Sequence, residues 1–424
     1  MSYVAPASCD EFSIAIVCAL ALEFDAVSLL FDEFWANEGD KYRKADGDRN
    51  EYTMGRVGKY NVVLVLLANM GKSEAASVGA GLRSSYRALK LVLLVGVCGG
   101  APRANDGRDI FLGDVIISNS IVQYDFGRRF PDKFVPKDTA IDNLGRPNQH
   151  FRRVLATLET DHVGGQFESR ISDILRDLQA KAGGRKERRG KKDRYRYPGA
   201  ATDMLFRPAY RHKHQDLSAI CICNSCATDA DPVCDSSLKL SCADLGCETA
   251  HLVARDRLIK KQQLEKEGDP AVQDPAIHVG MVASADTVLK SAADRDKLAE
   301  TYKAIAFEME GPGLWDEGPC LIVKGVCDYA DSHKHKNWQD FAAATAASAA
   351  KALLEIIVPS DSAAEAAASR RNTSGVIPSS GAAAAAAGPQ IHASGPSYSF
   401  GNISGRNVIV SPVTTGGAVT YNFS

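Results

Sequence analysis

Residues 304–331, AIAFEMEGPGLWDEGPCLIVKGVCDYAD, carry the strongest structural signal in this chain. Ala304–Met309 predicts a short apolar strand, and Gly311–Gly318 contains residues typical of a helix and a turn. Cys320–Val326 predicts a second strand, of the type that is buried on both faces of a sheet. The segment therefore indicates a strand, a helix and a second strand that ends in a loop.

Carboxylates stand where these two predicted strands end, with Glu308 and Glu310 after the first and Asp328 after the second. A carboxylate is costly to bury unless partners hold it, so acids in such places are typical of acid/base or sugar-hydroxyl sites. The alternative is that these acids cap the following helices. Capping is favoured for Asp331, whereas a functional site is favoured for Glu310 and Asp328.

The chain before this segment also alternates between apolar strands and amphipathic helices. Ser13–Ala19 and Leu91–Val97 predict buried strands, and Tyr52–Val57 with Tyr60–Ala68 predicts a hairpin. The expected fold class is α/β, with three layers: a mixed, largely parallel central sheet and flanking helices.

Length and composition narrow the class of protein. The chain has 424 residues, 45% of them hydrophobic, and a net charge of −2, which gives no general attraction to nucleic acid or membrane. The apolar run Phe12–Leu22 is flanked by acids, so no signal peptide is expected, and no run approaches the ~20 residues of a membrane span. Eleven cysteines, several in predicted strands, favour a reducing compartment, and a cytoplasmic location is predicted.

Four motifs carry a family resemblance: DMLFRP (203–208), IHVGMVASADTVLK (277–290), FEMEGPGLW (307–315) and CDYADSHKHKNWQDFAAATAA (327–347). Together they resemble the purine nucleoside phosphorylase and nucleosidase superfamily, from Phe12 to about residue 357. Within it, the chain is similar to the nucleoside-phosphorylase-like domains of fungal immune-receptor and effector proteins. The resemblance implies a cofactor-free enzyme that cleaves N-glycosidic bonds and assembles as a homo-oligomer.

Composition divides the chain into three parts. Residues 1–358 are the expected phosphorylase-like domain, with an insertion that contains a basic loop at about 145–199 and a Cys-rich loop at 221–247. Residues 359–396, rich in Ala, Ser, Gly and Pro, predict a flexible linker. Residues 397–424 are β-prone and nearly uncharged, which is typical of segments that stack with copies of themselves.

In this tail, Asn407–Ser411 and Ala418–Phe423 predict two short strands separated by a turn near Pro412. The tail loosely resembles the prion-like signalling motifs of fungal immune proteins. The resemblance implies an immune receptor as partner, whose matching motif would template stacking and switch on the enzyme. The alternative is a passive disordered tail.

Cleavage of a purine N-glycosidic bond needs an acid for the base, a partner for the ribose hydroxyls and a nucleophile on the opposite face. By resemblance, Asp328 is the acid that protonates the base. Glu310, with Glu308 beside it, binds the ribose hydroxyls, and Met309 contacts the sugar. The alternatives are a helix N-cap for Glu310 and a core position for Met309.

The nucleophile decides between hydrolysis and phosphorolysis. Glu23 stands where nucleosidases carry the glutamate that activates water, and a carboxylate there would repel phosphate. Leu91–Val95, directly before the glycine-rich strand end at residues 96–100, contains no arginine, so hydrolysis is favoured. The alternatives are a first-turn helix acid for Glu23, a phosphate-dependent phosphorylase of nucleoside catabolism, and an inactive scaffold or sensor.

Further residues complete the predicted pocket. By resemblance, Val288 stands in the place of the base-stacking aromatic, and backbone groups of Val288 and Leu289 could read the base edge. Cys327 stands where nucleosidases often carry serine. Lysines near the site would suit the phosphates of a purine nucleotide, ATP first. The additional predicted substrate-binding residues are Cys98, Gly99, Val288, Leu289, Cys327, Lys72 and Lys334.

Six cysteines fall between residues 221 and 247. Their thiolates, with His212 and His214 nearby, could bind zinc. The spacing lacks two clean C-x2-C pairs, so free thiols are favoured and no metal is predicted.

Overall fold

The computed structural model describes residues 4–35, 41–137, 144–184, 193–216, 220–228 and 231–357, and the backbone of 412–415 and 418–421. The chain divides into two compact units, Met1–Ala366 and Ala367–Ser424. The carboxylates of interest all belong to the first unit.

The first unit is built on a nine-stranded sheet with the order β10-β9-β6-β11-β5-β1-β4-β3-β2. Five of the nine pairings in this sheet are parallel, so the predicted mixed, largely parallel sheet is confirmed. The strands are β1 (Ile14–Cys18), β2 (Glu33–Phe34), β3 (Tyr52–Val57), β4 (Tyr60–Leu66), β5 (Leu91–Gly100), β6 (Val115–Gln123), β9 (Ile277–Ser284), β10 (Ala304–Glu308) and β11 (Cys320–Asp328).

One part of this sheet closes on itself. Besides its parallel pairing with β9, strand β10 pairs antiparallel with β5 through Ala306 with Gly100 and Phe307 with Gly99. Strands β5, β11, β6, β9 and β10 therefore form a closed ring, while β1, β4, β3 and β2 continue outward as an open sheet. The ring brings the ends of β5, β10 and β11 together.

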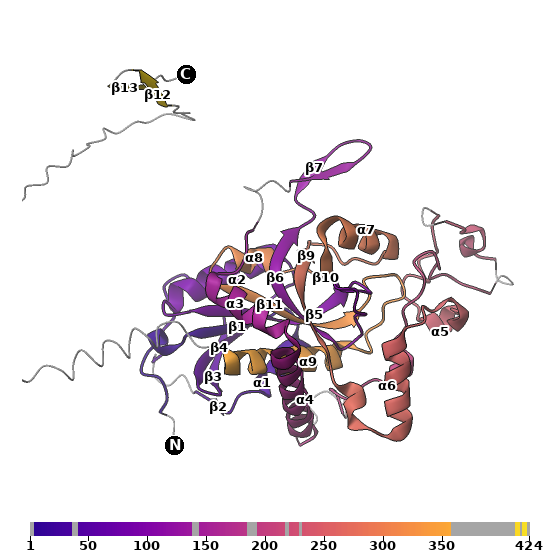
Figure 1. Ribbon diagram of the computed structural model, residues 1–424, viewed down its shortest axis with the longest axis horizontal. Helices are drawn as coiled ribbons and strands as arrows, with labels where there is room; N and C mark the ends of the chain where they lie inside the picture. Colours follow the sequence, from indigo (N-terminus) through magenta and orange to yellow (C-terminus); the bar gives the residue numbers. More distant parts are fainter. Residues whose placement is uncertain are drawn as a thin grey trace, which may run out of the picture. The chain divides into compact units, whose positions relative to one another are not determined.

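Helices cover both faces of the sheet, as expected for three layers (Figure 1). Helix α9 packs on β5, β6 and β11 with α1 and α4 behind it, while α8 packs on the same strands with α2 behind it. The helices are α1 (Ala21–Ser28), α2 (Lys72–Ser85), α3 (Gln149–Leu158), α4 (Asp161–Gly183), α5 (Cys242–Leu245), α6 (Asp256–Glu267), α7 (Ala292–Tyr302), α8 (Gly311–Trp315) and α9 (Gln339–Ile356).

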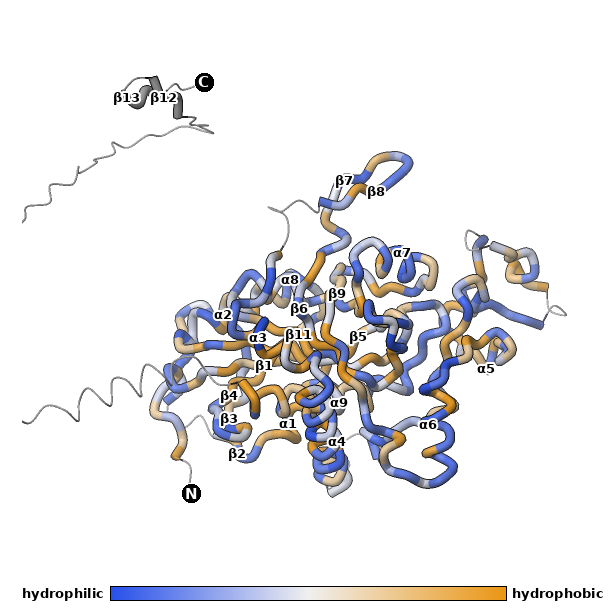
Figure 2. The backbone as a smooth tube through the Cα atoms, viewed as in Figure 1, coloured by the Kyte–Doolittle hydropathy of each residue, from blue (hydrophilic) through white to orange (hydrophobic). Residues whose placement is uncertain are grey.

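The core lies between the central strands and α9, where Figure 2 shows the hydrophobic residues concentrated. Nearly every residue of α9 from Phe341 to Leu354 is buried, and most are alanine. Small side chains let the helix lie very close to β11, because a Cβ atom at Gly325 would be 2.0 Å from the Ala342 carbonyl oxygen. Such packing tolerates no added volume.

The remaining elements are short. A hairpin of β7 (Gly127–Arg129) and β8 (Phe134–Pro136) projects from the sheet (Figure 1), and single 3-10 turns lie elsewhere. Of the predicted basic loop, residues 185–192 lie outside the described residues. Within the described part of the chain, no helix is both long and apolar enough to cross a bilayer.

The second unit contains one hairpin, β12 (Pro412–Thr415) paired antiparallel with β13 (Ala418–Tyr421). The second predicted strand of the tail thus overlaps β13. The first described strand begins at Pro412, where a turn was expected, because proline is tolerated as the first residue of a strand. Asn407–Ser411, the predicted first strand, lies outside the described residues.

Candidate functional site

Three strands meet at Gly99, and several predicted site residues lie around it. Gly99 of β5 pairs with Phe307 of β10 and with Asp328 of β11. A Cβ atom on Gly99 would lie 3.0 Å from Oδ1 of Asp328 and 2.9 Å from Cβ of Ala330. Glycine is therefore required for the end of β11 to approach β5 this closely.

Asp328, the predicted acid, is buried at the last position of β11. Its Oδ1 accepts a hydrogen bond from the Ala330 N–H at 2.9 Å, in a turn that holds Ala330 at a φ of +50°. Its Oδ2 accepts from the Cys327 thiol at 3.4 Å and lies 3.1 Å from Nζ of Lys334. The carboxylate is thus held in one orientation with an ammonium as counter-ion.

A buried network holds the chain immediately after Asp328. The Tyr329 hydroxyl donates to Oδ1 of Asp203 at 2.7 Å, and Arg255 donates to the same oxygen at 2.8 Å. Arg295 donates to the Tyr329 carbonyl oxygen at 2.9 Å and lies 3.6 Å from Asp331. Asp203 opens the DMLFRP motif, so this motif acts by fixing the strand end that carries the predicted acid.

Lys324 is the residue that sequence reasoning missed. It lies in the middle of β11, is 1% exposed, and its Nζ is 3.3 Å from Oε2 of Glu310, which is also buried. Burial alone would lower the pKa of Lys324, but the charges of Glu310, Glu23 and Glu308 outweigh it and raise that pKa. A lysine inside an otherwise apolar strand was the available signal, because a buried ammonium requires carboxylate partners.

Glu23, the predicted nucleophile-activating residue, begins the buried side of α1. Its Oε2 accepts from the N–H groups of Ala19 at 2.8 Å and Leu20 at 2.9 Å, and its Oε1 accepts from the Val97 N–H at 2.8 Å. Burial raises the pKa of Glu23, while Lys324 and the backbone donors oppose the shift. These three backbone donors support the alternative that Glu23 is an acid in the first turn of a helix. The two carboxylate oxygens offer about four acceptor sites, so about one remains for a further donor.

Glu308 ends β10 and turns the chain into α8. Its Oε2 accepts from the N–H groups of Glu310 and Gly311, both at 2.9 Å, so the side chain satisfies backbone donors at the start of this short helix. Burial, and next the charge of Glu310, raise the pKa of Glu308. Glu308 therefore orients the turn that presents Glu310.

The predicted contacts for base and sugar have different environments. Leu289 packs against a small apolar cluster that includes Phe307 and Ala330, Met309 is half-buried, and Val288 is half-exposed in the loop after β9. Cys98 and Cys327 are buried, and desolvation raises the pKa of both thiols. Both are therefore neutral at physiological pH.

The two predicted phosphate-binding lysines differ in their partners. Nζ of Lys72 lies 2.6 Å from both carboxylate oxygens of Asp125 and 3.4 Å from Asp286, and its N–H donates to Asp286 at 3.0 Å. Lys72 therefore ties together the loops after β4, β6 and β9. Lys334 is paired with Asp328, one of the candidate catalytic groups.

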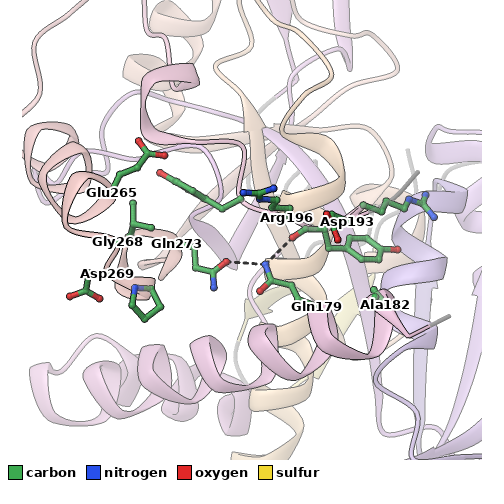
Figure 3. Close-up of a pocket in the computed structure, with 14 residues that line it drawn as sticks. Gln179, Ala182, Asp193, Arg196, Glu265, Gly268, Asp269 and Gln273 are labelled. Atoms are coloured by element: carbon green, nitrogen blue, oxygen red, sulfur yellow. Dashed lines mark hydrogen bonds between the residues drawn. The ribbon is translucent and has the colours of Figure 1, made fainter. Parts of the chain in front are cut away.

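A cavity of about 500 Å³ lies away from these carboxylates, among the end of α4, the end of α6 and the residues that follow each (Figure 3). Gln179 donates to Oε1 of Gln273 at 2.9 Å within it. Its residue Arg194 is paired with Asp25 and Asp340. Glu23, Glu310 and Asp328 do not line it. We therefore place the candidate site at the buried charged residues around Gly99 and not in this cavity.

Two groups of His and Cys side chains could hold a metal ion: His212, Cys242, Cys247 and His333, and His214, Cys221, Cys223 and Cys234. Within each group, the four ligand atoms lie within 4.8 Å of one another.

The chain is similar to known proteins in sequence. Residues 13–182 match the profile of the family described as the phosphorylase superfamily. Over 344 residues, or 80% of this chain, it is 29% identical to a nucleotide-binding leucine-rich repeat (NLR)-like protein of Hyaloscypha variabilis. The chain spans 28% of the length of that relative.

Solved structures similar to this chain include two from Helicobacter pylori. One is a 5′-methylthioadenosine/S-adenosylhomocysteine nucleosidase and the other is a futalosine hydrolase. Each is 14% identical, with a TM-score of 0.41, and the match covers 82% of this chain and 99% of the other.

Proposed function

Because residues 13–182 match the phosphorylase superfamily, we propose that this chain hydrolyses the N-glycosidic bond of a purine nucleotide. ATP is the first candidate, and the products would be adenine and a ribose phosphate. The observation that carries the proposal is the set of buried acids Asp328, Glu310 and Glu23 on the converging elements β11, α8 and α1.

Asp328 is the proposed general acid. It would protonate the purine, commonly at N7, so that the base leaves neutral while oxocarbenium character develops on the ribose. Its ammonium partner, Lys334, is 22% exposed along its side chain, so it is accessible to a ligand. Phosphates of a bound nucleotide would attract Lys334, and a buried carboxylate that loses its counter-ion takes up a proton more readily.

Glu310 is the proposed partner of the ribose hydroxyls. Its ion pair with Lys324 supports this role, because the buried ammonium compensates the charge of a carboxylate that can accept from two hydroxyl donors. Glu308 supports it indirectly by fixing the turn through the Glu310 N–H.

Glu23 is the proposed partner of the attacking water. Its acceptor capacity beyond the three backbone donors suits one water molecule, and its negative charge disfavours phosphate as the nucleophile. The proposal of hydrolysis over phosphorolysis rests on this residue.

The similarity to an NLR-like protein supports a role as an effector in fungal innate immunity or regulated cell death. In this proposal, release of adenine would deplete nucleotide in the cell. The proposal also includes a homo-oligomer and activation by a receptor through the C-terminal tail.

The decisive experiment is a chromatographic assay of the purified full chain with ATP, AMP, adenosine, inosine and methylthioadenosine, each with and without phosphate. Adenine released from ATP without phosphate is the expected result. Release that requires phosphate would identify a phosphorylase instead. No release from any substrate would favour an inactive scaffold or sensor.

A further inference from the structure

Cysteines of the Cys-rich segment (residues 221–247) and three histidines outside it form two groups of four potential metal ligands. The proximal site consists of His212, Cys242, Cys247 and His333, and the distal site of His214, Cys221, Cys223 and Cys234. His212 and His214 are two residues apart, in a stretch outside helices and strands with a bend at Lys213, and belong to different sites. Each group brings together four side chains that are separated in the sequence, so the fold, not a run of adjacent residues, forms both groups.

Distances in the proximal site match a tetrahedral zinc centre. Bonds of ~2.3 Å to sulfur and ~2.05 Å to nitrogen place two nitrogens ~3.3 Å apart and a nitrogen and a sulfur ~3.6 Å apart. Nδ1 of His212 and Nδ1 of His333 are 3.3 Å apart. Sγ of Cys242 lies 3.7 Å and 3.5 Å from these two nitrogens, and Sγ of Cys247 lies 3.7 Å from Nδ1 of His212.

The other ring nitrogens support a cation at this point. Nε2 of His212 lies 3.0 Å from the Leu240 carbonyl oxygen, and Nε2 of His333 lies 2.9 Å from the Tyr210 carbonyl oxygen. A carbonyl oxygen only accepts, so each Nε2 carries the proton and each neutral Nδ1 presents a lone pair. Two lone pairs that face each other repel unless a proton or a metal ion lies between them, and an outer nitrogen that faces a backbone carbonyl is typical of metal-bound histidines.

The distal site has similar distances. Nδ1 of His214 lies 3.4 Å from Sγ of Cys234 and 3.7 Å from Sγ of Cys221. Cys223 is buried, and its Sγ accepts from the Cys234 N–H at 3.5 Å. Three sulfurs and one nitrogen suit zinc better than calcium or magnesium, which take oxygen ligands.

The segment between the two sites has little apolar core of its own. Ile222, Leu238 and Leu240 are 53%, 60% and 38% exposed, and described regular structure there is limited to α5 and short 3-10 turns. Segments that bury so little apolar surface are usually held by disulfides or metal ions. All the cysteines here are free thiols.

We propose that the proximal and distal sites each bind one Zn²⁺ as a closed structural centre with four protein ligands. On binding, the ligand thiols release their protons to solvent and bind as thiolates. The zinc atoms have no part in the cleavage reaction, so the inference stands apart from the proposed function.

The proximal zinc would also tie the Cys-rich segment to the loop that follows the candidate acid. His333 is five residues after Asp328, its N–H donates to Oδ1 of Asp331 at 3.0 Å, and its ring stacks on Phe206 with centroids 4.1 Å apart. Sequence spacing favoured free thiols because it lacks two clean C-x2-C pairs, and the ligand His333 lies far along the chain from the cysteines.

The test is the zinc content of the full chain, produced with added zinc and dialysed, measured by inductively coupled plasma mass spectrometry. About two zinc atoms per chain are expected. Cys242→Ser and Cys223→Ser should each lose one. The matched control is Cys226→Ser, because Cys226 is buried in the same segment but belongs to neither site, and it should retain both.

A second measurement uses the wild-type chain and so does not depend on whether the variants fold. Cobalt exchanged into the wild-type chain should give the visible bands of tetrahedral thiolate-bound Co²⁺.

A zinc content near one atom per chain would overturn one site, and the variant that retains this zinc would show which site is overturned. A content near zero, or an intact mass showing disulfides among the ligand cysteines, would overturn both sites. Either result would leave the nucleosidase assay unaffected.

Discussion

At the scale of single residues, Asp328 is the sharpest test of the proposed chemistry. Asp328→Asn keeps the shape of the side chain but cannot donate a carboxylic proton, so the rate of base release should fall by about 10²–10⁴-fold. Measured turnover of the variant should be compared with Asp46→Asn, whose side chain is 98% exposed and which should be unchanged. Near wild-type turnover for Asp328→Asn would place the acid elsewhere.

Glu23 offers a prediction for stability against pH. Burial raises its folded-state pKa above the ordinary value of 4.5, so the folded chain binds a proton there more tightly than the unfolded chain does. This contribution is fully present below about pH 4.5 and is lost as the pH rises through the folded-state pKa. Wild-type unfolding free energy should therefore fall, relative to Glu23→Gln, as the pH is raised from 4.5.

Denaturant titrations of both proteins across this pH range provide the measurement. The absolute stability of Glu23→Gln also reflects the replaced acceptor, so only the pH dependence of the difference is informative. A difference that stays constant with pH would show that Glu23 titrates in the folded chain as it does in the unfolded chain.

Some residues of the candidate site could be predicted from the sequence, and others could not. Acids at predicted strand ends indicated Asp328 and Glu310 as site residues, whereas their approach depends on the pairing of both β10 and β11 with β5 at Gly99. Lys324 was missed because its strand was considered only as an apolar segment. The Lys72–Asp125 pair joins loops that are distant in sequence, which no local pattern encodes.

At the scale of elements, the close approach of β11 to β5 makes Gly99 sensitive to substitution. Gly99→Ala would place a methyl group 3.0 Å from Asp328 Oδ1 and 2.9 Å from Ala330 Cβ, so the strand end must shift. A displacement of about 1 Å can lower a catalytic rate by ~10²-fold. We expect such a loss of turnover with a normal circular dichroism spectrum.

Gly165→Ala is the matched control. Gly165 lies inside α4 with no atom within 4 Å of the added methyl group, so the change should stabilise the chain by ~0.5–1 kcal/mol. If Gly99→Ala retained full activity, the crowding at the strand ends would have no bearing on catalysis.

Elements with strong local signals were predicted well. The β3–β4 hairpin pairs Val57 with Tyr60 around Gly58, whose φ is +61°, as the turn residues indicated. The ring closure of β10 on β5 was not predicted, because two pairings between segments far apart in sequence leave no periodic signal. Tertiary contacts alone determine the pairing of β10 with β5.

At the scale of the whole molecule, the tail is predicted to stack with copies of itself. Residues 398–424 fused to a fluorescent protein should form foci in a fungal host, because the edges of a two-stranded hairpin such as β12–β13 can pair with another chain. Val419→Pro is the matched variant, since it removes a backbone donor from β13 and should leave the fusion diffuse. A wild-type fusion that stays diffuse, with a peptide that forms no fibres, would contradict the prediction.

The closed ring has one seam, between β10 and β5, that is shorter than its other joints. Only Ala306 with Gly100 and Phe307 with Gly99 join β10 to β5, whereas β11 and β5 are paired along most of their length. Asp328 lies on one side of this seam and Glu310 follows the strand on the other. Amide hydrogens at the seam should therefore exchange with solvent before those of the long strands. The part of the sheet that opens most easily would then lie between Asp328 and Glu310, the groups proposed to hold the base and the ribose of the same nucleoside.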